Sequence, residues 1–122
     1  MTQRIEDYAL IGDCESGALV GRDGSIDWLC WPRYDSGACF AALLGGPEHG
    51  RWRIAPTGEV VRTERRYRGD TLILETTFST ATGEVMLVDF MPAEGMQSRV
   101  VRTVVGVRGE VDMHVELILR FG

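Results

Sequence analysis

The sequence lacks several features that would assign it at once to a class of protein. It has no apolar run long enough to cross a bilayer. Its first residues, MTQRIEDYALIGD, lack the basic segment followed by an apolar segment that marks a signal peptide. It carries 13 basic against 18 acidic residues, whereas a nucleic-acid-binding surface needs concentrated positive charge. These absences predict a cytoplasmic protein that binds neither nucleic acid nor a membrane.

The common catalytic and metal-binding patterns are also missing. There is no G-x-S-x-G nucleophile elbow, no phosphate-binding glycine loop, and no C-x-x-C or H-x-x-x-H spacing. The two histidines, His49 and His114, lie in unlike contexts, so a serine or cysteine triad has little to draw on. An odd number of cysteines (Cys14, Cys30 and Cys39) favours buried free thiols over a disulfide framework. The sequence therefore predicts no metal and no cofactor.

What the sequence does contain is short apolar runs separated by turn signals. Asp-Gly at 23–24, between two such runs, predicts a hairpin, and further turns are expected at 69–70, 81–84 and 108–109. About seven to nine strands of this kind in 122 residues predict one all-β domain, an antiparallel β-sandwich. The segment DSGACFAALLGG has a cap residue at its start and two glycines at its end, so it predicts one short helix.

The last strand of the sequence has a strict alternation. Its apolar positions are expected to form one buried face, opposite a solvated face that includes His114; they are Val111, Met113, Val115, Leu117 and Leu119. The final residues, LILRFG, still have the pattern of a strand, and no further residues cover its edge. We therefore expect a partial super-sandwich, truncated at its C-terminus, whose uncovered edge and apolar face favour a homo-oligomer.

One stretch, GRDGSIDWLCWPRYDSGACF, concentrates aromatic and charged residues. Such residues compose a sugar-binding wall, and a glycosidase needs two carboxylates across the scissile bond; they are Asp27, Trp28, Trp31, Arg33, Tyr34 and Asp35. In the structural interpretation, Trp28 is a core residue, Asp27 lies on the solvated face of a strand, and Asp35 caps a helix. Spacing alone favours the structural interpretation.

Longer ordered segments of the chain carry a resemblance to a known family. IEDYALIGD, ALVGRDGSIDWLCWPRYDSGACFAALLG and GRWRIAP occur in this order, followed by RRYRGDTLILETTF and VMLVDFMP. Together they resemble the N-terminal domain of bacterial glycoside hydrolase family 15 proteins, which are the glucoamylase-like and trehalase-like enzymes. The resemblance covers nearly the whole chain. The residues at 14–16 and Gly37 depart from the family's pattern at turn positions.

The resemblance implies a trehalase-like β-sandwich over residues 1–122 that precedes an (α/α)6 barrel. In such enzymes the barrel carries the catalytic glutamates and hydrolyses α-glucosidic bonds of maltose, starch-type glucans or trehalose. This chain has no barrel, so no catalytic residue of the family carries over to it. The resemblance also implies that one segment contacts the barrel or substrate, namely Trp31, Arg33, Tyr34 and Asp35.

Two other functions stay open at this point. The chain could be a small stand-alone carbohydrate-active hydrolase that uses Asp27 and Asp35 as its acid and base. It could also be a self-associating carbohydrate-binding or assembly module.

Overall fold

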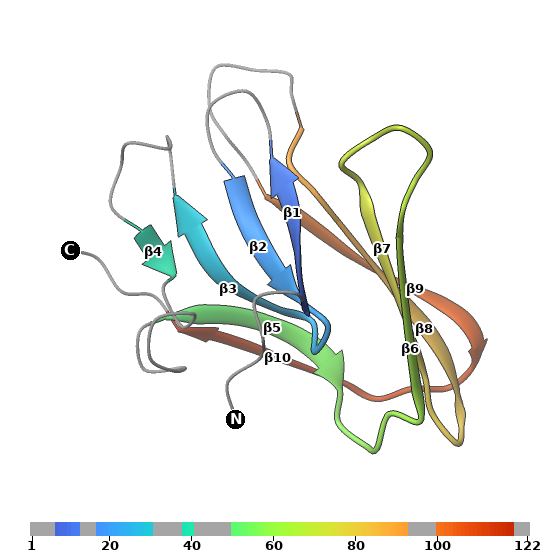
Figure 1. The fold of residues 1–122 in the computed structure, drawn as a ribbon. Coiled ribbons are helices and arrows are strands. Elements are labelled where there is room, and N and C mark those ends of the chain that lie inside the picture. The colour runs from blue at the N-terminus through green and yellow to red at the C-terminus, as the bar shows by residue number, and fades with distance from the viewer. Residues whose placement is uncertain (1–6, 13–16, 31–37, 41–49, 93–99, 119–122) are drawn as a thin grey trace.

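The protein is a sandwich of two antiparallel sheets (Figure 1). Its computed structural model describes residues 7–12, 17–30, 38–40, 50–92 and 100–118. The strands are β1 (Tyr8–Gly12), β2 (Gly17–Gly21), β3 (Ser25–Cys30), β4 (Ala38–Phe40), β5 (Arg51–Pro56), β6 (Arg62–Tyr67), β7 (Leu74–Ser79), β8 (Gly83–Phe90), β9 (Val101–Gly109) and β10 (Met113–Ile118). Sheet A has the order β1-β2-β3-β5-β10, with β4 paired to β3, and sheet B has the order β6-β7-β8-β9. The predicted all-β antiparallel sandwich is confirmed.

The two sheets pack through apolar inner faces that the alternation of each strand creates. One core cluster joins sheet A to the start of β7 and contains Ile11, Ala18, Val20, Ile26, Leu74 and Met91. The second cluster joins β5 to the middle of sheet B and contains Ile54, Phe78, Val85 and Leu87. Trp52 packs against both clusters, so the sandwich has one continuous interior.

Three of the four predicted turns lie at glycines with positive φ, and the fourth, at 81–84, lies where β7 is followed by β8. Gly24, with φ of 81°, turns β2 into β3, and its N–H donates to the carbonyl of Gly21 at 3.1 Å. Gly69 and Gly109 also have positive φ, 57° and 63°. The turn at Gly109 does not form a hairpin, because β9 belongs to sheet B and β10 to sheet A. The chain therefore crosses between the layers there.

The expected short helix is wrong where the structure describes its segment. Ala38–Phe40 is strand β4, which pairs with β3 through Leu29↔Phe40 and Cys30↔Ala38. The rest of the expected helix, from 35 to 37 and from 41 to 46, lies outside the described residues. The cap and stop signals are local, and pairing with a neighbouring strand outweighs them.

The expected burial of the last strand is only partly correct. Met113 and Val111 pack against the second core cluster. Val115 and Leu117 share the inner face, since they pair with Ile54 and Trp52, but they are 59% and 54% exposed. The reason is that β10 is an edge strand of sheet A. Leu119 lies outside the described residues, and the expected exposure of His114 is confirmed.

A buried ion pair fastens sheet B to sheet A. The guanidinium of Arg102 in β9 binds the carboxylate of Asp89 in β8, with Nε 2.7 Å from Oδ1 and both side chains fully buried. Arg102 also donates to the carbonyl of Trp52 at 2.5 Å and to that of Gly24 at 2.6 Å. Its guanidinium lies 5.2 Å from the centre of the Trp52 ring. One side chain thus links β8, β5 and the β2–β3 turn.

Candidate functional site

A β-bulge shapes the outer face of sheet A. The register of β2 and β3 shifts so that Leu19 pairs with Trp28 while Val20 pairs with Ile26. Asp27 is the extra residue of this bulge. Directly paired residues share a face, so Trp28 lies on the outer face with Leu19, and Ile26 stays in the core. The expected core position of Trp28 is wrong, and its side chain is partly exposed.

The bulge completes an apolar row that crosses three strands. Leu10 of β1 pairs with Leu19 of β2, which pairs with Trp28 of β3. Leu10 is 44% exposed, and the other two side chains are partly exposed. We call these three residues the apolar row. It ends on β3, whose last residue directly precedes Trp31 in the chain.

Asp27 lies beside the apolar row but is only 7% exposed. Its Oδ2 accepts a hydrogen bond from the hydroxyl of Tyr8 at 2.5 Å, and its Oδ1 accepts one from Ser25. Burial, together with the bond to Asp27, raises the pKa of Tyr8 above its ordinary value. The expectation that Asp27 is solvated is therefore wrong, and its carboxylate ties β1 to β3.

The remaining residues of the predicted site lie outside the described part of the chain; they are Trp31, Arg33, Tyr34 and Asp35. The structure therefore describes the surface that directly precedes this segment, which is the apolar row with Asp27 and Tyr8 beside it.

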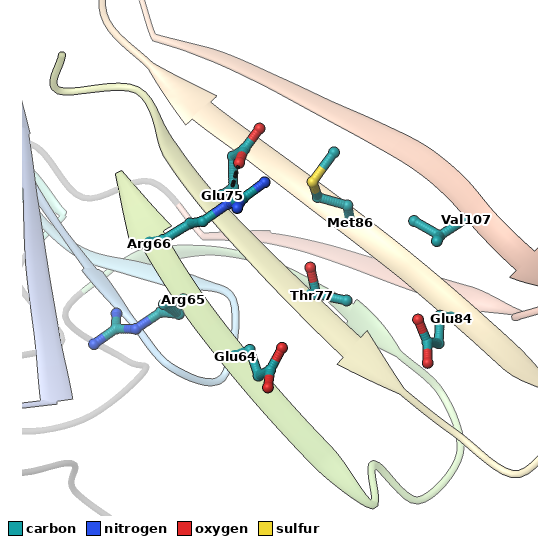
Figure 2. Close-up of a pocket in the computed structure, with 8 residues that line it drawn as sticks. All are labelled: Glu64, Arg65, Arg66, Glu75, Thr77, Glu84, Met86 and Val107. Carbon is teal, nitrogen blue, oxygen red and sulfur yellow. Dashed lines mark hydrogen bonds and ion pairs between the residues drawn. The ribbon is translucent and has the colours of Figure 1, made fainter. Parts of the chain in front are cut away.

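A second candidate is a hollow on the outer face of sheet B, of about 690 Å³. Figure 2 shows Arg66 and Glu75 joined across neighbouring strands, with Thr77, Met86, Glu84 and Val107 spread over the sheet. Arg65 points away from this group in the same view, and its Nη1 donates to the carbonyl of Val20 at 2.9 Å. Arg65 and Arg66 therefore lie on opposite faces of sheet B.

The carboxylates of this hollow are held by arginines. Glu75, 6% exposed, binds Nε of Arg66 at 2.9 Å and Nη2 of Arg68 at 2.7 Å. The hydrogen bonds from Arg68 and Arg66 lower the pKa of Glu75 below its ordinary value. A glycosidase acid needs the opposite, a carboxyl whose pKa is raised so that it keeps its proton. Glu75 is therefore suited to holding the sheet surface together and unsuited to acid catalysis.

A raised carboxyl pKa does occur, at Asp89. Burial raises it, and the charge of Arg102 offsets part of that effect. Because Asp89 is fully buried and bound by Arg102, it has no route to a substrate. In the described ranges, no group of three or more His, Cys, Asp or Glu side chains could hold a metal ion. The same residues include no helix with the length and apolar character needed to span a bilayer.

Comparison with known proteins identifies the family of this sandwich. The family described as "Trehalase-like, N-terminal" matches residues 1–120. The chain belongs to this family. The resemblance found in the sequence is thus confirmed at the level of the trehalase-like N-terminal domain. No solved structure matches the chain.

Several relatives of this trehalase-like domain are named trehalase. The trehalase of Mycolicibacterium smegmatis is 44% identical over 85 residues, which are 70% of this chain and 13% of that protein. The trehalase of Mycobacterium tuberculosis is 42% identical over 85 residues, 70% of this chain and 12% of that protein. Trehalase 1 of Sulfolobus acidocaldarius is 32% identical over 117 residues, 96% of this chain and 20% of that protein. The chain therefore matches only a small part of the length of each of these relatives.

The Glu75 cluster gives the trehalase-like domain a testable acid sensitivity. The pKa of Glu75 is lowered on folding, so its contribution to stability is present above the ordinary glutamate pKa and is lost as pH falls through the lowered value. Glu75→Gln is expected to cost about 1–2 kcal/mol at about pH 7, and the difference from the parent protein should shrink towards about pH 3. Urea unfolding at both pH values measures this. The control Glu64→Gln, in an exposed pair with Arg62, should cost less than about 1 kcal/mol. A Glu75→Gln deficit that does not change with pH would contradict the assignment.

Proposed function

We propose that the chain is the N-terminal domain of a glycoside hydrolase of family 15, and that it supports a catalytic (α/α)6 barrel. The substrate class is an α-glucoside, either trehalose or a maltose- or starch-type glucan. The observation that carries this proposal is the family match over residues 1–120, joined to relatives named trehalase that extend far beyond the matched segment. The predicted cytoplasmic location stays a prediction from the N-terminal sequence.

The electrostatics of the described residues support a non-catalytic role for this domain. A hydrolytic pair needs one accessible carboxyl that keeps its proton and one that is ionised. The carboxylate of Asp27 accepts hydrogen bonds from Tyr8 and Ser25. The carboxylate of Glu75 is bound by two arginines, and Asp89 is fully buried and bound by Arg102. The chemistry is therefore assigned to the barrel in this proposal.

The proposed docking or substrate-contacting residues are Trp31, Arg33, Tyr34 and Asp35. The apolar row supports this placement, because it presents Leu10, Leu19 and Trp28 on the outer face of sheet A and ends where the segment begins. An aromatic and aliphatic surface beside a charged segment is the composition of an interface core with a polar rim. We therefore propose that the apolar row and residues 31–35 form one continuous contact with the barrel.

A chimera tests the proposal. The segment of the Mycolicibacterium smegmatis trehalase that matches this chain is replaced by the chain, and glucose release from trehalose and maltose is measured. We expect the chimera to release glucose and the 122-residue chain alone to release none. In the chimera, Trp31→Ala combined with Leu10→Asp should lower activity at least about tenfold by loosening the domain contact.

The matched control is Arg62→Ala, which removes a 69% exposed side chain from β6 in sheet B and should leave the activity of the chimera unchanged. Glucose release by the isolated chain, lost in Asp27→Asn or Asp35→Asn with the circular dichroism spectrum preserved, would refute the proposal. It would support a stand-alone hydrolase instead.

A further inference from the structure

Strand β10 lies at one edge of sheet A in the described part of the chain. It pairs with β5 on one side, and no described strand pairs with its other side. The N–H of Thr57 donates to the carbonyl of Asp112 at 2.9 Å, so this opposed pair is a hydrogen-bonded one. Hydrogen-bonded and non-hydrogen-bonded pairs alternate along an antiparallel ladder. The backbone groups of Met113, Val115 and Leu117 therefore point away from β5, towards the free edge.

The side chains of β10 alternate between the two faces of the sheet with the same two-residue period. Met113, Val115 and Leu117 lie on the inner face, opposite Pro56, Ile54 and Trp52 of β5. Val115 and Leu117 are more than half exposed there. His114 and Glu116 lie on the outer face, and the side chain of Glu116 is held by Arg51, whose Nε is 2.6 Å from Oε1. Among the residues that the structure describes, nothing pairs with the outer backbone groups of this edge or covers its apolar face, and His114 and Glu116 lie beside them.

We propose that two copies of the chain associate by antiparallel pairing of β10 with β10, with Val115 of one copy opposite Val115 of the other. In this register Met113 of each copy lies opposite Leu117 of the second copy. The backbone groups at the free edge then form the hydrogen-bonded pairs, and the apolar side chains of both copies meet on the inner face. His114 of each copy lies opposite Glu116 of the second copy, in the non-hydrogen-bonded positions where side chains are closest.

Charge and pattern select this register over its neighbours. A shift by an odd number of residues would place apolar residues of one copy opposite polar residues of the other. Centring the pair on His114 would oppose Asp112 to Glu116 of the second copy, and centring it on Glu116 would oppose the two Glu116 carboxylates. Like charges directly opposite each other destabilise a ladder, whereas His114 opposite Glu116 stabilises it. Among the registers centred on His114, Val115 and Glu116, the one centred on Val115 therefore avoids opposed like charges and pairs His114 with Glu116.

The neighbouring edge of sheet B adds apolar surface to the same interface. Val104 of β9 pairs with Leu87, a core residue, so it lies on the inner face of sheet B, yet it is 44% exposed. The strands β9 and β10 are edge strands of the two sheets, and the crossing at Gly109 joins them. In the dimer, the inner face of the extended sheet A therefore lies on the same side as the inner face of sheet B, which carries Val104. This inference does not depend on the proposed hydrolase function.

Sedimentation equilibrium of the full 122-residue chain from about 1 μM to about 1 mM tests the proposal. We expect a concentration-dependent dimer of twice the 13.6 kDa mass. Val115→Pro removes an N–H that points away from β5, a substitution that edge strands tolerate, and should weaken the dimer at least roughly a hundredfold. The matched control Val115→Thr keeps the N–H and the β-branched shape, and should change the dissociation constant by only about threefold.

A charge pair tests the register without a proline. His114→Glu should weaken the dimer roughly tenfold, because it opposes a new carboxylate to Glu116 of the second copy, and His114→Lys should preserve or strengthen it. If Val115→Pro fails to fold, the comparison of His114→Glu with His114→Lys tests the proposed dimer. A chain that stays monomeric over the whole range would overturn the proposal. So would a folded Val115→Pro variant that dimerises like the parent, or equal effects of the two His114 substitutions.

Discussion

Replacement of Arg102 by alanine is expected to lower the free energy of unfolding by about 3–5 kcal/mol. The substitution leaves the carboxylate of Asp89 buried with no counter-charge, and it removes the hydrogen bonds that Arg102 donates to the carbonyls of Trp52 and Gly24. A buried unpaired charge costs far more than a lost surface pair. Because the same side chain spans both sheets, the loss should loosen the packing of the whole sandwich.

Urea unfolding of the two variants Arg102→Ala and Arg108→Ala measures this difference. Arg108 faces Glu84 at 3.5 Å with its side chain 59% exposed, so its removal should cost less than about 1 kcal/mol. The double variant Arg102→Met with Asp89→Leu removes both charges together and should recover most of the lost stability. Similar losses in Arg102→Ala and Arg108→Ala would show that the buried pair does not fasten the sheets.

Substitution of Gly24 by alanine is the second change with a large expected effect. Its φ of 81° disfavours any side chain, and an added Cβ would lie 2.1 Å from the carbonyl oxygen of Ile54. That carbonyl belongs to β5 backbone, which cannot move without breaking the close approach of the turn to the strand. We expect a loss of at least about 3 kcal/mol, since a left-handed backbone and a backbone clash add together.

Substitutions at two other glycines separate the cost of the left-handed backbone from the cost of the clash. Gly69 also has positive φ, 57°, but an added Cβ meets nothing within 4 Å, so Gly69→Ala should cost about 1–2 kcal/mol. Gly58 has neither constraint, so Gly58→Ala should be close to neutral. Thermal unfolding should rank the three variants in this order. A Gly24→Ala protein as stable as Gly69→Ala would mean that the turn does not press against Ile54.

Much of the architecture could be predicted from the sequence, because alternation and turn chemistry are local signals. Asp-Gly at 23–24 and the glycines at 69 and 109 mark turns whatever the chain does elsewhere, since they supply the positive φ that the turn requires. Trp52 and Ile54 alternate with arginines and do face the core. Two packed antiparallel sheets follow from such strands once each must bury one face.

The candidate site was harder to predict from the sequence, because it depends on how the strands pair. The bulge at Asp27 moves Trp28 to the outer face, and simple alternation of β3 gives no sign of the extra residue. The Asp89–Arg102 pair joins two adjacent strands on a face that packs on sheet A, so its burial depends on a layer formed by other parts of the chain. Charged residues on a strand ordinarily indicate a solvated face, and here that signal points the wrong way.

The sequence indicated an uncovered edge at the last strand but not how far it exposes the inner face. Val115 and Leu117 have the same alternating pattern as a central strand, so alternation alone predicted them to be buried. The segment Ala38–Phe40 shows the converse effect, since a neighbouring strand recruits residues whose own signals favour a helix.

The crossing at Gly109 has a consequence for synthesis on the ribosome. Strand β5 meets β3 through only two residue pairs in the described chain, whereas it meets β10 through six. The contact between Arg51 and Glu116 spans 65 residues, so a nascent chain must wait for translation of all of sheet B before β5 acquires its main hydrogen-bonding partner. Until then the edge of β5 that later pairs with β10 is open to other nascent chains, so we expect β5 to be exposed to co-translational mispairing.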